Sequence, residues 1–252
     1  MAQHLYILTG ASRGMGFAMA EQLLASGNAL VAISRKSNPT LKAAATRAGA
    51  EFEEWHHDLA QAIPVAQKLS SWLGHQGTSH WASATLINNA GTLAVIKPLS
   101  DADPVDLSHA LRVGLEAPMQ LTAAFLHATR DWTGERKVLN ISSGLGRRAM
   151  ASQAAYCAAK AGMDHFTRCV ALDEEPKRNG AKICSLAPGV IDTDMQTALR
   201  AADPHAFPDI GNFRSLQKEG QLSSPVDAAA KVLGYLMRPD FGKNPVADVR
   251  DV

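Results

Sequence analysis

Three side chains in the middle of the chain have the types needed to move a proton. Tyr156 and Lys160 are four residues apart in a stretch with helical spacing, so they share one face of the predicted helix. Ser142 and Ser143 directly follow an apolar run that predicts a strand. Reduction of a carbonyl needs a hydride at carbon and a proton at oxygen; a phenol could supply the proton and a serine hydroxyl could hold the oxygen. An ordinary helix pair is the alternative for Tyr156 and Lys160 alone.

A second group of residues, near the N-terminus, predicts a dinucleotide site. An apolar run at residues 5–8 ends at Thr9, and glycines follow at Gly10, Gly14 and Gly16 before helical spacing begins. A strand, a glycine turn and a helix in this order present backbone N–H groups to a pyrophosphate. The spacing is G-x-x-x-G-x-G rather than the commoner G-x-G-x-x-G, so a glycine-rich loop without a ligand is the alternative.

The end of the second predicted strand bears on which dinucleotide is bound. Sites that prefer NAD usually carry an acidic residue there, which holds the ribose 2′-hydroxyl. This chain instead has Ser34, Arg35 and Lys36, and Arg13 lies inside the glycine turn. Because a guanidinium can bind a phosphate with two hydrogen bonds, these residues favour NADP(H) over NAD. A solvated basic turn is the alternative.

The elements that would position these residues alternate along the chain. Apolar runs predict strands at residues 5–8, 29–34, 51–56, 84–87, 137–141, 182–186 and 245–249. Helical spacing predicts helices at residues 17–26, 41–49, 60–74, 100–132, 152–175 and 224–238, with a bend near Gly114 caused by Pro118. We therefore expect one α/β domain over residues 1–252, a doubly wound parallel sheet of about seven strands with helices on both faces. The polar segment at about 194–221 is predicted to be a substrate lid of short helices.

Composition argues against several classes of partner. The 252 residues include 25 Lys and Arg against 24 Asp and Glu, so neither nucleic acid nor a membrane surface is expected as a partner. Three cysteines without a C-x-x-C pair predict neither a disulfide framework nor a zinc site, and no other metal site is expected. We expect a cytoplasmic protein, because the sequence shows no signal peptide and no apolar stretch of about 18 residues.

Together these motifs resemble the short-chain dehydrogenase/reductase family, which has a Rossmann fold. TGASRGMG at 9–16, NNAG at 88–91, the serine after the fifth strand, YCAAK at 156–160 and PG at 188–189 follow the family's order. The resemblance implies that Tyr156 and Lys160 are catalytic and that Lys160 also binds the nicotinamide ribose. The family's catalytic serine lies thirteen residues before its tyrosine, which selects Ser143 over Ser142.

The resemblance also implies a set of cofactor contacts. The phosphates would be bound by Gly10, Ser12, Arg13, Gly14, Met15 and Gly16. Adenine would contact Asp58 and Leu59, the adjacent ribose region would contact Asn88, Ala90 and Gly91, and the nicotinamide would be flanked by Pro188, Gly189, Val190 and Thr193. Lys160 and the positive nicotinamide of the oxidised cofactor are expected to lower the pKa of Tyr156.

The chain departs from the family's pattern at Gly114, where an asparagine is usual. In the family the backbone carbonyl of this residue helps to hold a water in the proton relay to the lysine. Proline has no N–H, so Pro118 leaves the Gly114 carbonyl without its helical donor. We expect this carbonyl to bind the relay water without the side chain.

The resemblance narrows to sepiapterin reductases and related bacterial benzil reductases, through APGVIDTDMQ, YCAAKAG, LEAPM and a short C-terminus. It implies an NADPH-dependent oxidoreductase that reduces one carbonyl of a small vicinal dicarbonyl, either a benzil-like diketone or a sepiapterin-like pterin. A homo-dimer or homo-tetramer is implied by analogy. The alternatives are another NADP(H)-dependent alcohol dehydrogenase or ketoreductase of the family, and a non-catalytic NADP-binding regulatory protein.

Two kinds of residue are candidates for substrate binding. Sepiapterin reductases anchor the pterin with an aspartate near the C-terminus, and Asp248 is its nearest counterpart. A benzil-like substrate would instead need apolar walls, for which the candidates are Leu145, Met150, Met195, Leu199 and Phe207. A surface position for Asp248, and ordinary core or lid positions for the apolar residues, are the alternatives.

Overall fold

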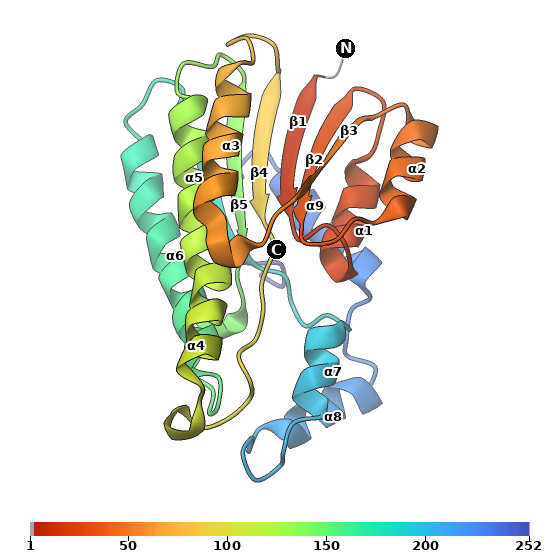
Figure 1. Cartoon of the computed structure of the whole chain (residues 1–252), viewed down its shortest axis with the longest axis vertical. Helices are drawn as coiled ribbons and strands as arrows, with labels where there is room; N and C mark the ends of the chain where they lie inside the picture. Colours follow the sequence, from red (N-terminus) through yellow and green to blue (C-terminus); the bar gives the residue numbers. More distant parts are fainter. Residues whose placement is uncertain (1–2, 252) are drawn as a thin grey trace.

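Seven parallel strands form one sheet in the computed structural model, which describes residues 3–251 (Figure 1). They are β1 (His4–Thr9), β2 (Asn28–Ser34), β3 (Glu51–His56), β4 (Ser83–Asn88), β5 (Glu135–Ile141), β6 (Lys182–Ala187) and β7 (Val246–Asp248). Their order, β3-β2-β1-β4-β5-β6-β7, changes direction between β1 and β4. Such a switch point leaves a crevice at the carboxyl ends of the strands, where ligands of doubly wound sheets bind. The predicted fold class is confirmed.

The middle residues of β1 are apolar because helices cover both faces of the sheet. In β1, Leu5 and Ile7 are buried on one face, whereas Tyr6 and Leu8 are buried on the other. Side chains alternate along a strand, so a strand that is buried on both faces has no polar side.

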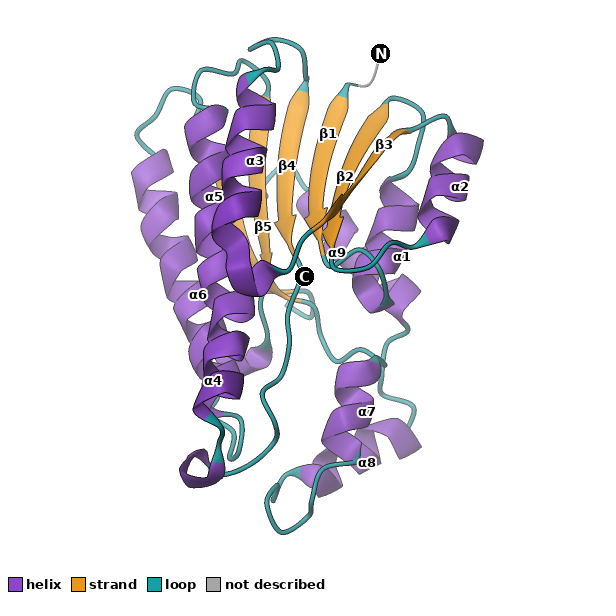
Figure 2. Cartoon of the chain, viewed as in Figure 1, coloured by secondary structure: helices purple, strands orange, loops and turns teal. Residues whose placement is uncertain are grey.

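Helices cover both faces of the sheet (Figure 2). One face packs against α1 (Gly14–Leu23), α2 (Pro39–Ala48) and α9 (Pro225–Leu236). The other face packs against α3 (Ala62–Gly74), α5 (Ala117–Ala128) and α6 (Ala154–Glu174). No helix within residues 3–251 is both long enough and apolar enough to cross a membrane.

The segment predicted as one helix over residues 100–132 is divided in the structure. It contains α4 (Pro104–Leu111), a π-helical turn (Arg112–Glu116) and α5, with Pro118 in the first turn of α5. Because Pro118 cannot donate to the carbonyl of Gly114, the α-helical hydrogen-bond register breaks at this point. The chain is therefore helical from Pro104 to Ala128, and the π-helical turn falls beside Gly114, where the bend was predicted.

Two short helices, α7 (Asp194–Arg200) and α8 (Ile210–Lys218), lie beyond the carboxyl edge of the sheet (Figure 1). They are held together by a small apolar cluster of their own, formed by Leu199, Phe207, Ile210 and Phe213. This cluster is separate from the two cores that flank the sheet. We refer to residues 194–221 as the α7–α8 segment.

Candidate functional site

A cavity of about 1330 Å³ lies at the carboxyl edge of the sheet, and the α7–α8 segment supplies part of its wall. All three predicted catalytic residues, Ser143, Tyr156 and Lys160, line it. So do most of the predicted cofactor residues: Gly10, Ser12, Arg13, Gly14, Met15, Gly16, Arg35, Asp58, Leu59, Ala90, Gly91, Pro188, Gly189, Val190 and Thr193. The predicted substrate residues Leu145, Met150, Met195, Leu199 and Asp248 also line it.

Two predicted residues do not line the cavity. Asn88 is buried inside the sheet, where its side-chain amide donates to Thr122 Oγ1 at 3.2 Å and to Asn140 Oδ1 at 2.9 Å. Its neighbour Asn89 lines the cavity instead. Phe207 is fully buried in the apolar cluster of the α7–α8 segment. Alternation within a strand and packing within a cluster thus decide which side chain faces the cavity, and the binding roles of Asn88 and Phe207 stay predictions.

The glycine turn has the shape that a bound pyrophosphate requires. Gly10 has a φ of +73°, and a Cβ at Gly16 would lie 2.1 Å from the carbonyl oxygen of Gly10. A side chain is therefore excluded where the helix meets the strand. No side chain caps the N-terminus of α1, so the N–H groups of its first turn remain available to an anion. These features fit the phosphates of a dinucleotide.

The basic residues near the turn differ in their partners. Arg35 and Lys36 line the cavity at the carboxyl end of β2. Arg13 forms an ion pair of 2.5 Å with Asp194, the first residue of α7, and both side chains are more than 70% exposed. Arg13 is thus bound to the α7–α8 segment, whereas the sequence predicted a guanidinium free for a phosphate.

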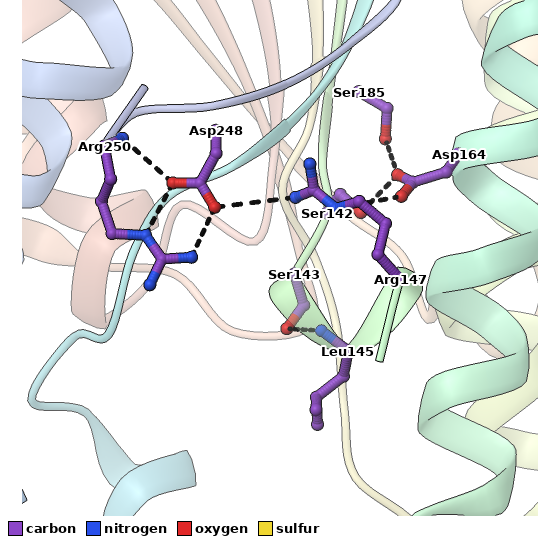
Figure 3. A network of polar contacts seen from close by, with 8 residues as sticks. All are labelled: Ser142, Ser143, Leu145, Arg147, Asp164, Ser185, Asp248 and Arg250. Carbon is purple, nitrogen blue, oxygen red and sulfur yellow. Dashed lines mark hydrogen bonds and ion pairs between the residues drawn. The ribbon is translucent and has the colours of Figure 1, made fainter. Parts of the chain in front are cut away.

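The two adjacent serines have different surroundings (Figure 3). The hydroxyl of Ser142 donates to Oδ1 of the buried Asp164 at 2.5 Å, and Ser185 donates to the same oxygen at 2.7 Å. Ser143 Oγ accepts a hydrogen bond of 3.2 Å from the backbone N–H of Leu145, and its hydroxyl also forms a hydrogen bond with Tyr156. Ser142 therefore belongs to a buried network, and Ser143 can offer a donor to the cavity.

Burial governs the protonation of Tyr156 and Lys160. Lys160 Nζ donates to the carbonyl of Ile141 at 2.6 Å and lies 5.7 Å from the centre of the Tyr156 ring. Burial lowers the pKa of Lys160 to about 8, against the opposing effect of Asp164. Burial raises the pKa of Tyr156, and a hydrogen bond with Ser143 opposes this rise. The expected lowering of the tyrosine pKa is thus not a property of the protein alone, in which desolvation outweighs the hydrogen bond with Ser143.

Asp248 faces the cavity, but its carboxylate is already paired (Figure 3). Its Oδ1 accepts from the backbone N–H of Arg250 at 3.0 Å and from Arg250 Nε at 2.8 Å. Its Oδ2 accepts from Arg250 Nη2 at 2.6 Å and lies 3.7 Å from Arg147 Nη2. The hydrogen bond from the Arg250 side chain lowers the pKa of Asp248 more than any other contact.

Several residues of the wall were absent from the sequence predictions. They include Asn89, Thr92, Leu93, His109, Val113, Arg147, Gln153, Gln196 and Arg250. Asn89 lies within the NNAG motif, which offered a signal, whereas the others come from α4, the π-helical turn, α7 and loops. Within residues 3–251 there is no group of three or more His, Cys, Asp and Glu that could hold a metal ion.

The amino-acid sequence of the chain is similar to those of known proteins. Residues 4–204 match the family model described as short chain dehydrogenase. The chain is 35% identical over 240 residues to a benzil reductase ((S)-benzoin forming) of Bacillus cereus, covering 95% of this chain and 96% of the relative. It is 29% identical over 262 residues to sepiapterin reductase of Bos taurus, covering 100% and 96%.

The fold comparison agrees with the sequence comparison. A crystal structure of a 3-oxoacyl-[acyl-carrier protein] reductase from Brucella melitensis in complex with NAD superposes with a TM-score of 0.80 at 22% identity, covering 99% of this chain and 96% of that one. The family and the subgroup predicted from the motifs are confirmed. The chain belongs to the short-chain dehydrogenase/reductase family of oxidoreductases.

Proposed function

We propose that the protein is an NADPH-dependent carbonyl reductase that converts one carbonyl of a vicinal dicarbonyl to the alcohol of a hydroxy ketone. The observation that carries this proposal is that Ser143, Tyr156 and Lys160 line the same cavity as the glycine turn. The similarity to benzil and sepiapterin reductases supports the substrate class.

The three side chains divide the proton chemistry among them. The cofactor, when bound, supplies the hydride that adds to the carbonyl carbon. Tyr156 donates its phenolic proton to the carbonyl oxygen, and its raised pKa keeps that proton on the phenol at neutral pH. Ser143 donates a hydrogen bond to the same oxygen as negative charge develops on it. The Lys160 ammonium favours departure of the proton from the phenol, which solvent then reprotonates.

The basic residues at the carboxyl end of β2 support NADPH as the cofactor. Arg35 and Lys36 line the cavity, and no acidic side chain occupies the end of β2. A 2′-phosphate there would meet positive charge, whereas the 2′-hydroxyl of NADH would find no carboxylate. We expect a higher kcat/KM with NADPH than with NADH, and we expect Arg35→Ala to reduce the difference. An intrinsic preference for NADH would refute this part of the proposal.

The α7–α8 segment supplies apolar side chains that suit a diketone. Met195 and Leu199 of α7 line the cavity, and Leu145 and Met150 line it from the loops after β5. We propose that this segment acts as a lid over the substrate, because it packs on an apolar cluster of its own that is separate from the two cores flanking the sheet. Burial of an aromatic diketone between these side chains would add to the free energy of binding.

Four exposed apolar side chains support assembly into a homo-dimer or homo-tetramer. Val105 and Leu111 of α4, Met119 of α5 and Leu172 of α6 are 39–76% exposed. Exposed apolar groups on neighbouring helices are typical of protein interfaces. Light scattering on the purified protein would give the mass of the assembly, and a monomer would contradict the proposal.

The decisive test is NADPH consumption by the purified protein with benzil and with sepiapterin. We expect turnover of at least one of them, and Tyr156→Phe should abolish it while leaving NADPH binding nearly intact. Unchanged activity in Tyr156→Phe would overturn the mechanism. Stoichiometric NADPH binding without turnover of any vicinal dicarbonyl would overturn the function and favour a regulatory protein.

A further inference from the structure

The wall of the cavity beside Ser143 carries a pair of arginines and a buried carboxylate that already accepts three hydrogen bonds. Both oxygens of Asp248 accept hydrogen bonds from Arg250, and Arg147 lies against the second oxygen. Asp248 is 5% exposed, so little of its carboxylate is open to another ligand. Asp164 lies behind this wall, is 2% exposed, and accepts from two serines.

The same wall retains hydrogen-bond donors. A guanidinium carries five N–H bonds. Arg250 uses one on Nε and one on Nη2 to hold Asp248, which leaves three. The Arg147 guanidinium lies 3.7 Å from Asp248 and 4.0 Å from Asp164, which are ion-pair distances beyond hydrogen-bond length. The side chains of Arg147 and Arg250 are 35% and 62% exposed, so these donors can be reached from the cavity.

The free donors of Arg250 lie close to Ser143, which is proposed to hold the reacting carbonyl. Arg250 Nη2 lies 3.9 Å from the position that a Cβ would occupy on Gly144, the residue after Ser143. The three hydrogen bonds to Asp248, one from the backbone and two from the side chain, fix the orientation of the guanidinium. A substrate whose reacting carbonyl is held by Ser143 therefore has its neighbouring atoms close to a fixed cation.

We propose that Arg250 is a specificity-determining residue, which binds the second carbonyl oxygen of the substrate and excludes substrates whose binding needs a free Asp248. This inference rests on the proposed function, since it gives a binding partner to the carbonyl of a vicinal dicarbonyl that is not reduced. A diketone offers only acceptors at that position, and these match the free N–H groups of the wall. The aminopyrimidine end of a pterin offers N–H donors, which need an accepting carboxylate. The carboxylate at this wall, Asp248, is already hydrogen-bonded to Arg250.

The test compares kcat/KM for benzil and for sepiapterin, with NADPH saturating, in the wild type and three variants. Arg250→Met removes the donors and frees Asp248, and Arg250→Lys keeps the charge without the two-point contact. Arg238→Met is the matched control, because Arg238 binds Asp240 through Nε and Nη2 at 2.9 Å but does not line the cavity. Thermal unfolding and NADPH binding show whether each variant is folded.

We expect the wild type to favour benzil. Loss of a hydrogen bond to a charged donor should lower kcat/KM for benzil about 10-fold or more in Arg250→Met. The same change should raise kcat/KM for sepiapterin, Arg250→Lys should give intermediate values, and Arg238→Met should match the wild type. A benzil-to-sepiapterin ratio that is unchanged in Arg250→Met, or that changes equally in Arg238→Met, overturns this inference alone. A wild type that reduces no dicarbonyl overturns the proposed function as well.

Discussion

The two sides of the cavity are held in place by different kinds of interaction. On the sheet side, buried hydrogen bonds fix the elements that carry Ser143 and Lys160: Asp164 accepts from Ser142 and Ser185, and Lys160 donates to Ile141. On the other side, the α7–α8 segment rests on a small apolar cluster and on contacts at its edges. Buried networks must stay satisfied, so the sheet side is costly to deform.

The contacts of the α7–α8 segment with the rest of the chain are weaker. The Arg13–Asp194 pair is exposed, and such pairs typically contribute about 1 kcal/mol or less. Ser152, which has a φ of +61°, donates to the carbonyl of Ala206 at 2.5 Å. The comparison teaches that the groups proposed for chemistry are fixed, while the segment proposed as a lid can open at low cost.

The largest contrast is expected within the sheet side, between its two serines. Ser143→Ala removes the donor to the substrate oxygen, so kcat should fall about 100-fold or more. Loss of its hydrogen bond from the Leu145 N–H should lower the free energy of unfolding by only about 1 kcal/mol. Ser142→Ala removes a donor from the buried Asp164, so urea unfolding should show a loss of about 1–3 kcal/mol. Equal effects of the two substitutions on kcat would contradict the separate functions assigned to them.

A second prediction concerns Lys160 and the stability of the sheet side. Its pKa is about 8 in the folded chain against 10.5 for an exposed lysine, so folding carries the full desolvation cost below pH 8. Between these values the unfolded chain binds more protons, and the free energy of unfolding therefore rises with pH. The stability of the wild type relative to Lys160→Met should grow by about 2 kcal/mol between pH 7 and about pH 9.5.

Urea unfolding at several pH values measures this difference. Lys218→Met, at an exposed position of α8, is the matched control and should show no such growth. A constant difference between the wild type and Lys160→Met across this range would mean that the Lys160 ammonium is not desolvated by folding.

A smaller effect is expected at the edge of the α7–α8 segment. Asp194→Asn releases Arg13 from its ion pair, which should lower KM for NADPH about 3-fold and leave KM for NADH unchanged, because a free guanidinium can bind the 2′-phosphate. The free energy of unfolding should change by less than about 1 kcal/mol. Asp209→Asn, in the same segment, is the control. An equal fall in KM for both cofactors would exclude a specific contact between Arg13 and the 2′-phosphate.

The smallest effect is expected at Gly114, in the π-helical turn beside α6. A Cβ there would lie 3.1 Å from Cβ of Ala159, so Gly114→Asn should cost about 1 kcal/mol of stability through tight packing. Turnover should change less than about 3-fold, because the backbone carbonyl is retained. A large gain in turnover would show that the proton relay is defective without the side chain.

Local patterns in the sequence predicted much of the fold and of the site. The spacing of apolar residues along a strand or a helix involves only residues that are near one another in the sequence. The strands and most helices could therefore be predicted. The glycine motif at 9–16 and the spacing of Tyr156 and Lys160 indicated candidate site residues, and the structure brings them to one cavity. The interruption at Arg112–Glu116 was not predicted as a π-helical turn, because the register after a proline depends on packing against α6.

The sequence by itself determined the family, the parallel α/β sheet and the residue types at its carboxyl edge. Only the tertiary structure decided which of these side chains are free to act. Arg13 and Asp194 are 181 residues apart, so no spacing could reveal that they pair. Asp248 and Arg250 are two residues apart, yet only the turn at the end of β7 brings the guanidinium onto both carboxylate oxygens. The charge that a cavity offers depends on such pairing, because a carboxylate whose oxygens are already bonded no longer attracts a ligand as a free one does.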